Sequence, residues 1–264
     1  MYSRHKSIGI DTYGILTRNY YSDYICRVLS PQPLKSPQMT CCIACLADSG
    51  KSAVLASDNM LCHTIDKNTL YLAEATSELK IIELSSTNYI LISGDGGMAD
   101  SIISMAEIKS DESPSEIAKK ISEKLVQYVK ERKEIILRQY DLTWNTFLPM
   151  MQHMEANFLS ELTQKLNLYN ANCDFIAVGR DNSSENVSLY QVDANGVTTD
   201  RTKIGSAIIG IGMSLANLSL VKSRYDKSMP LSEIEKIVEA AIECASHSYG
   251  VGRKGSIFKI PSTE

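Results

Sequence analysis

MTCCIAC at residues 39–45 and SAVLASD at residues 52–58 are two short, mostly apolar stretches separated by the polar segment DSGK. This pattern predicts two strands joined by a hairpin turn. The first strand would begin at Thr40 and the second would end at Asp58. A third apolar run, KIIEL at residues 80–84, opens with Lys80. A threonine, an aspartate and a lysine therefore stand at the ends of three strands that follow one another in the chain.

The length and composition indicate an ordinary globular protein. The chain has 264 residues, with 44% apolar and 22% charged side chains, which is enough for one large domain. A formal net charge of −4 gives no reason to expect nucleic acid or a membrane as a partner. Seven cysteines without regular spacing favour reduced thiols over a disulfide framework. There is no apolar run of signal-peptide or membrane-spanning type, so we expect a cytoplasmic protein.

The chain divides at about residue 39. Residues 1–38 hold five of the thirteen tyrosines and three of the seven prolines, without clean periodicity, and residues 30–38 read as an irregular linker. Residues 1–39 could be a removable propeptide, a permanent extension, or the product of a start codon upstream of the true one at Met39. Residues 40–264 are predicted to form one folded unit.

Further strands and helices follow from the apolar periodicity. The sequence GDGG at residues 94–97 would end a strand and lead into a helix over residues 98–108. Ser113 and Glu116 form a capping-box pattern before a long helix that begins at Pro114. Ser232 and Glu235 suggest the same device for the last helix. Other helices are expected at 144–166 and 213–225, and strands at 40–47, 52–58, 80–84, 87–93, 174–179, 188–192, 204–209 and 255–260. Two blocks of strands separated by helix pairs predict an α+β sandwich of four layers.

From Thr40 onward the chain resembles the proteasome β-subunit type of N-terminal-nucleophile (Ntn) hydrolase. More narrowly, it resembles prokaryotic proteasome-like proteins that open with Met-Thr and a short apolar strand. The order of elements carries the resemblance: the hairpin ending at Asp58, the Lys80 strand, the ISG turn at residues 92–94, the DFIAVGRD segment at 174–181, LYQVDANG at 189–196 and the GIG helix start at 210–212. The resemblance implies a four-layer αββα sandwich and a threonine hydrolase that cleaves amide bonds in peptides or proteins. It also implies a homo-oligomer, a ring or stacked ring, and neither a cofactor nor a metal.

The chemistry explains why these residue types are wanted. A threonine hydroxyl is a weak nucleophile until a base removes its proton. The α-amino group of a threonine that begins the chain can be this base, because its reference pKa of about 7.7–8 lies near neutral pH. Lys80 would lower the pKa of this amine, and Asp58 would orient Lys80. The backbone N–H of Gly94 would stabilise the oxyanion. The resemblance assigns the same roles to Thr40, Asp58, Lys80 and Gly94.

Three positions depart from the family pattern. Ile211 replaces a serine that helps to hold the threonine amine, and Ser248 and Val251 stand where an aspartate and a serine support the nucleophile. Two alternatives therefore stay open: a catalytically inactive scaffold or assembly protein of the same fold, and a non-proteolytic Ntn amidase or transferase.

The cysteines of the first strand offer two other hypotheses. Cys42 and Cys45 have the spacing of half a zinc site, but residues three apart on a strand face opposite sides. Cys41 would become the nucleophile if the chain were cut one residue later.

Overall fold

The computed structural model describes residues 40–64, 70–74, 80–168, 170–181 and 184–263, with the backbone alone at 61–64, 70–74 and 168. The predicted leader, residues 1–39, lies outside the described residues. The described residues form two compact units. The larger unit contains residues 40–132 and 170–263, and the smaller unit contains residues 133–168.

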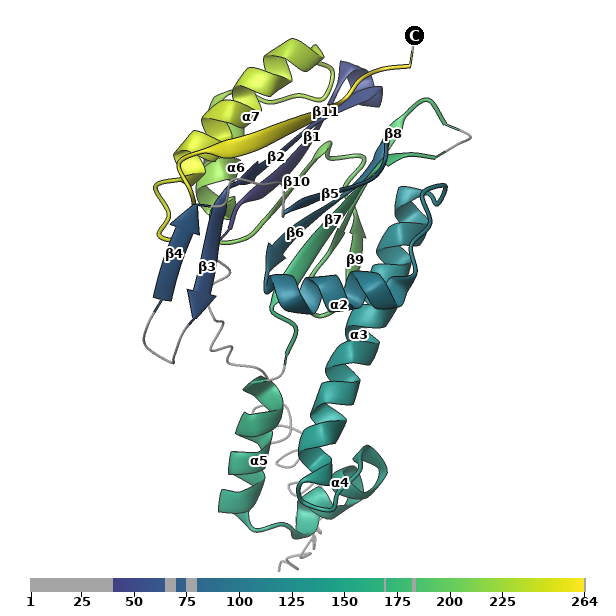
Figure 1. Cartoon of the computed structure of the whole chain (residues 1–264), viewed down its shortest axis with the longest axis vertical. Coiled ribbons are helices and arrows are strands. Elements are labelled where there is room, and N and C mark those ends of the chain that lie inside the picture. Colours follow the sequence, from purple (N-terminus) through teal and green to yellow (C-terminus); the bar gives the residue numbers. More distant parts are fainter. Residues whose placement is uncertain (1–39, 65–69, 75–79, 169, 182–183, 264) are drawn as a thin grey trace, which may run out of the picture. The chain divides into compact units, whose positions relative to one another are not determined.

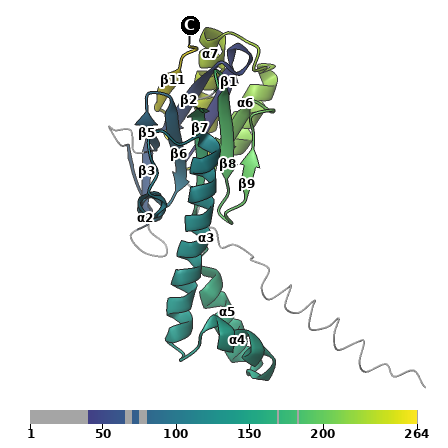
Figure 2. The ribbon, with the colours of Figure 1, turned by 90° about the vertical axis from the view of Figure 1, so that its right-hand side faces the viewer.

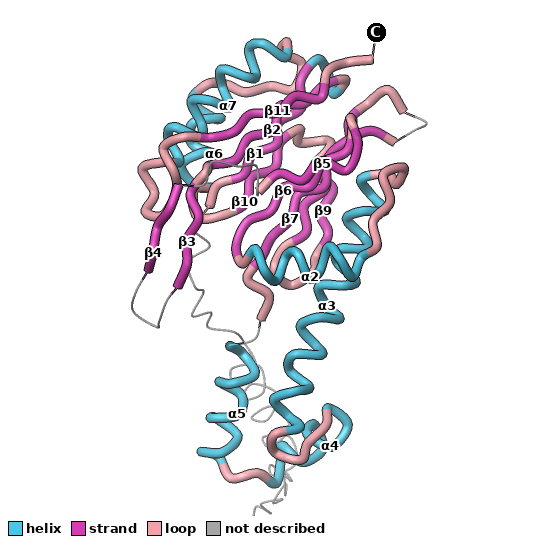
Figure 3. The backbone as a smooth tube through the Cα atoms, viewed as in Figure 1, coloured by secondary structure: helices cyan, strands magenta, loops and turns pink. Residues whose placement is uncertain are grey.

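The larger unit is built on two antiparallel sheets (Figure 1). The first sheet has the strand order β10 (Ser206–Ile209), β1 (Cys42–Ala47), β2 (Ser52–Asp58) and β11 (Gly255–Ile260). The 3-10 turn η1 (Asp48–Gly50) joins β1 to β2. The second sheet runs in the order β5 (Ile81–Ser85), β6 (Asn88–Gly94), β7 (Cys173–Arg180), β8 (Val187–Val192) and β9 (Thr198–Asp200). A separate hairpin of β3 (Met60–Thr64) and β4 (Leu70–Glu74) follows β2 (Figure 3).

Four helices pack on these sheets. Helices α6 (Met213–Lys222) and α7 (Leu231–Ala245) bury one face of the first sheet, where the odd-numbered residues of β1 point. The even-numbered residues of β1 contact the second sheet instead. Helix α2 (Gly96–Ala106) and the first part of α3 (Pro114–Arg138) bury the other face of the second sheet (Figure 2). The strict alternation of β1 follows from the two-residue repeat of a strand, and both of its faces are apolar because both are covered.

The smaller unit is helical and has its own apolar core. It contains the end of α3, then α4 (Trp144–Met150), the 3-10 turn η2 (Met151–His153) and α5 (Ala156–Leu168). The sequence predicted one helix over residues 144–166, and this prediction is wrong. Pro149 lies in the last turn of α4, and a proline disfavours continuation of a helix because it lacks an N–H and crowds the preceding turn.

The prediction of a mixed fold with two blocks of strands is confirmed, and the predicted strand limits differ from the observed ones by at most two residues. The capping box before α3 is confirmed, because Ser113 N donates to Glu116 Oε2 at 2.9 Å and Glu116 N donates to Ser113 Oγ at 3.3 Å. The predicted cap at Ser232 is wrong, since α7 begins at Leu231 and its N-cap residue is Pro230, two residues earlier, without a side-chain cap. Strands β3, β4 and β9 were not predicted. Among the described residues, no helix has the length and apolar character needed to cross a membrane.

Candidate active site

The predicted site residues meet at one end of the two sheets. Asp58, at the end of β2, lies beside the start of β1, because its backbone N–H donates to the Cys41 carbonyl at 3.0 Å. Lys80 precedes β5 and lies beside the end of β6, because its carbonyl accepts from Ile92 N at 2.9 Å. Nζ of Lys80 reaches Asp58 Oδ1 at 2.8 Å. The start of β1, the end of β2, the start of β5 and the end of β6 therefore share one end of the unit.

The Asp58 carboxylate is the centre of this arrangement. Its side chain has no exposed surface, and it accepts four hydrogen bonds. Oδ1 accepts from Cys41 N at 2.7 Å and from Lys80 Nζ at 2.8 Å. Oδ2 accepts from Met60 N at 3.0 Å and from Gly252 N at 2.9 Å. A buried carboxylate needs this number of donors, because nothing else replaces the water that it has lost.

Lys80 is not a solvated lysine at a sheet edge. Its side chain is 11% exposed and its ammonium group is paired with Asp58. Burial raises the pKa of the neighbouring Cys41 and Cys42 thiols; the positive charge of Lys80 opposes this rise, and the negative charge of Asp58 adds to it. Both charges of the ion pair thus act on the first residues of β1, in opposite directions.

Thr40 is buried, and its backbone is held from two sides. The carbonyl of Thr40 accepts from Gly212 N at 3.3 Å, and the next peptide N–H, that of Cys41, is bound by Asp58. Gly210 has φ +94°, and a Cβ placed on it would lie 2.1 Å from the Thr40 carbonyl oxygen. The GIG sequence at 210–212 is therefore required by the close approach of the Thr40 backbone.

Gly94 ends β6 and is exposed. Its φ is +102°, and a Cβ would lie 1.8 Å from the Asn172 carbonyl oxygen, so only glycine fits. Helix α2 begins two residues later, where Asp95 accepts from Met98 N at 3.0 Å. Direct hydrogen bonds join Asp58 to Lys80 and to Cys41. Gly94 is connected to this group only through its strand β6, in which the Ile92 carbonyl accepts from Cys42 Sγ at 3.2 Å.

The three positions that depart from the family pattern have ordinary surroundings. Ile211 is 40% exposed. Val251 belongs to the apolar core under α6 and α7, and the half-buried Ser248 accepts from Val251 N in the turn after α7. The residue that this segment contributes to the site is Gly252, through its backbone N–H. The sequence analysis assigned Gly252 no role, because a backbone donor carries no residue-type signal.

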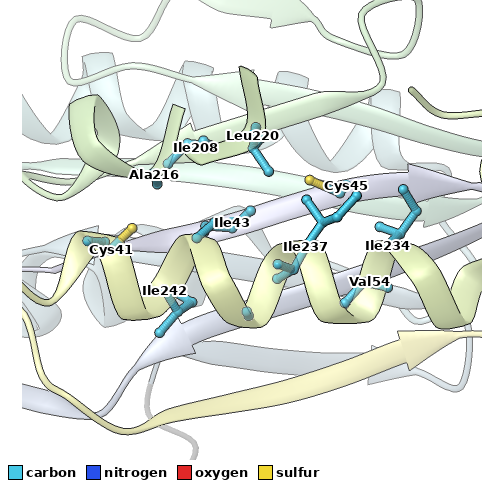
Figure 4. Packing of buried hydrophobic residues seen from close by; sticks show 14 of the residues in the cluster. Cys41, Ile43, Cys45, Val54, Ile208, Ala216, Leu220, Ile234, Ile237 and Ile242 are labelled. Carbon is cyan, nitrogen blue, oxygen red and sulfur yellow. The ribbon is translucent and has the colours of Figure 1, made fainter. Parts of the chain in front are cut away.

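The structure disfavours both cysteine hypotheses. Cys41 and Cys45 point into the core beneath α7, as Figure 4 shows, whereas Cys42 faces the second sheet. Cys42 and Cys45 thus lie on opposite faces of β1. Burial raises the pKa of the Cys41 thiol well above its ordinary value and that of Cys42 to about 12, so neither is a ready thiolate. Within the described part of the chain, no group of three or more His, Cys, Asp or Glu side chains could hold a metal ion.

Comparison with known proteins supports the fold. No protein-family model matches the chain, and no curated protein matches it. Its structure is similar to that of Anbu (ancestral beta-subunit) from Yersinia bercovieri, with a TM-score of 0.56 and 14% sequence identity. The similarity covers 83% of this chain and 81% of that chain. At this identity the likeness shows the fold alone, which is proteasome-like.

Proposed function

We propose that this protein is a proteasome-like threonine hydrolase that cleaves amide bonds in peptides or proteins, with Thr40 as the nucleophile when Thr40 is the first residue. One observation carries the proposal. The fully buried carboxylate of Asp58 binds the peptide N–H that follows Thr40 and the Lys80 ammonium group with the same oxygen. Such a shared carboxylate fixes a nucleophile and a cation relative to each other, as catalysis requires.

In the proposed reaction, the free α-amino group of Thr40 takes the proton of the Thr40 hydroxyl as the oxygen attacks the substrate carbonyl carbon. The negative charge then develops on the former carbonyl oxygen, to which the backbone N–H of Gly94, an exposed residue, would donate. Collapse of this intermediate breaks the C–N bond, and the leaving amine takes the proton from the Thr40 ammonium. Water, activated by the same amine, then hydrolyses the ester on Thr40.

The packing supports the finer fold assignment within this proposal. The buried clusters follow one another as α6 and α7 on the first sheet, the first sheet on the second, and the second sheet on α2 and α3. We infer that this succession is the four-layer αββα arrangement of the Ntn-hydrolase type. A homo-oligomer, as a ring or stacked ring, belongs to the same proposal.

The decisive experiment is intact-mass measurement and N-terminal sequencing of the protein purified from its native host. We expect a species that begins at Thr40, and we expect it to hydrolyse fluorogenic peptide amides. Thr40→Ala should abolish hydrolysis, and Thr199→Ala, on the exposed strand β9, is the matched control that should not change it. A protein that begins at Thr40, folds and cleaves no amide would contradict the proposal.

A second candidate function is an inactive scaffold of the same fold. It is favoured by Ile211, which is partly exposed, and by Val251, which is buried in an apolar core, because neither supplies a polar group to Thr40. Retention of residues 1–39 in the native protein, without peptide hydrolysis, would support this candidate. A preference for small nonpeptide amides over peptides would instead indicate an Ntn amidase or transferase.

A further inference from the structure

Ser93 carries a buried hydroxyl group that the proposed mechanism does not use. The residue is 1% exposed, and its Oγ has no hydrogen-bond partner among the residues that the structure describes. Ser93 is the last residue before Gly94, at the end of β6. A buried hydroxyl without a partner lowers stability, because its hydrogen bonds to water are lost and not replaced. Such a group is rare in a folded protein and calls for a structural or functional explanation.

The alternation of β6 shows where this hydroxyl points. Tyr89 and Leu91 lie in the core between the two sheets, together with Cys42 of β1. Ile90 and Ile92 lie on the opposite face, under α2 and α3. Because side chains alternate along a strand, Ser93 faces the first sheet, as Leu91 does.

The first sheet presents Thr40 at this place. Cys42 Sγ contacts the Ile92 carbonyl, which fixes the start of β1 against the end of β6. Thr40 lies two residues before Cys42 in the chain, and Ser93 lies one residue after Ile92. In both strands this direction runs toward the end of the sheets at which Asp58 and Lys80 meet.

We propose that Ser93 is a positioning residue for the nucleophile, and that its hydroxyl oxygen accepts a hydrogen bond from the α-amino group of Thr40 when that residue begins the chain. The inference rests on the proposed function for the identity of this amine. The bond turns the lone pair of the neutral amine toward the Thr40 hydroxyl, from which it must take a proton. The side chain of Ile211 is a hydrocarbon, so it offers the amine no comparable group.

Charged groups at this end of the sheets also act on the pKa of the amine, and they are the same in the parent and in the Ser93 variants. They are Lys80, its partner Asp58, and Asp174 of β7, which lies opposite Ser93 in the sheet and accepts from Ala194 N at 2.8 Å. A hydrogen bond to Ser93 favours the protonated amine, so its loss lowers the pKa of the amine. The Ser93→Ala variant therefore holds a less basic and less well oriented amine.

The test uses the full chain with a site-specific protease sequence in place of residues 34–39, cut after folding so that Thr40 becomes the first residue. The variants are Ser93→Ala, Ser93→Thr, which keeps a hydroxyl, and the matched control Ser52→Ala. Ser52 is also a buried strand serine, but its hydroxyl donates to Asp48 at the opposite end of β2. The measurements are thermal unfolding before cutting and, after cutting, the pH dependence of amine acylation at Thr40, followed by mass spectrometry.

Before cutting, Ser93→Ala should raise the melting temperature by about 2 to 4 °C, because an unpartnered hydroxyl is removed, whereas Ser52→Ala should lower it. After cutting, Ser93→Ala should shift the midpoint of acylation downward by about half a pH unit or more, while Ser93→Thr and Ser52→Ala should leave it in place. A lower melting temperature for uncut Ser93→Ala would show that a water or another group already binds the hydroxyl, and would overturn the proposal. An unchanged acylation midpoint would also overturn it. Peptide hydrolysis is measured in parallel. If the acylation midpoint depends on Ser93 but the protein hydrolyses no peptide, the proposed function is rejected and the role of Ser93 is retained.

Discussion

Removing the Asp58 carboxylate should destabilise the protein more than removing the Lys80 ammonium. In Asp58→Asn, the Lys80 ammonium loses its one acceptor within the described residues, and the new amide NH₂ faces backbone N–H donors. Breaking a buried ion pair from one side costs about 3–5 kcal/mol. In Lys80→Met, the carboxylate keeps three backbone donors, so we expect a smaller loss of about 1–3 kcal/mol.

Urea unfolding of the single and double variants measures these free energies, and the double-mutant cycle gives the coupling of the pair. Thermal unfolding should show a loss of about 6 to 20 °C for Asp58→Asn, at about 2–4 °C per kcal/mol for a chain of this size. Hydrogen exchange at the Cys41 and Gly252 amides reports the site itself, and both should exchange faster in Asp58→Asn than in Lys80→Met. A Lys80→Met variant that is as unstable as Asp58→Asn would refute this reasoning, because the three backbone donors would then contribute nothing.

Three more predictions follow from single residues. Gly94→Ala should cost at least about 2 kcal/mol in unfolding experiments, because of its positive φ and the facing carbonyl, whereas Gly96→Ala, with open space around it, should be neutral or slightly stabilising. Because burial raises the pKa of the Cys42 thiol to about 12, the thiol loses its proton in the unfolded state before it does so in the folded state. The free energy of unfolding should therefore fall as the pH rises from 9 toward 12, by up to about 1.4 kcal/mol per pH unit for this thiol. Cys42→Ala should make the melting temperature depend less on pH over this range. Arg180→Lys should cost about 2 kcal/mol, because the buried guanidinium donates to three backbone carbonyls, whereas Arg138→Lys on the exposed face of α3 should stay within about 0.5 kcal/mol. If Arg180→Lys were as stable as the parent, a lysine ammonium group would be able to replace the three hydrogen bonds of the guanidinium, which would contradict this prediction.

Most of the fold could be predicted because its signals are local. The two strands of the first hairpin are continuous apolar runs bounded by the polar DSGK segment, and the observed β2 begins and ends where the sequence indicated. The break between α4 and α5 was missed, because apolar residues continue at helical spacing across Pro149. The hairpin of β3 and β4 was also missed. It occupies part of the segment between Asp58 and Lys80, for which the sequence analysis predicted no strand.

The candidate site could be predicted only where side-chain chemistry marks it. Asp58 and Lys80 were paired from their order on neighbouring strands, and they form an ion pair in the structure. Gly252 was missed because it acts through its backbone, 194 residues from Asp58 in the chain. Ser93 was read as part of a turn, and only the structure shows that its hydroxyl is buried without a partner.

The geometry changes how Lys80 can act on the proposed base. The carboxylate oxygen of Asp58 lies only 2.8 Å from Lys80 Nζ. The effects of these two opposite charges on the pKa of a third group, such as the Thr40 amine, therefore largely cancel. Like-charge repulsion from Lys80 is therefore a weak means of lowering the pKa of the Thr40 amine. Burial of Thr40 acts in the same direction without this cancellation, because desolvation disfavours the ammonium form. The main contribution of the ion pair is then positional. It fixes the peptide N–H after Thr40, and substitutions at Lys80 should lower the rate of hydrolysis more than they shift its pH dependence.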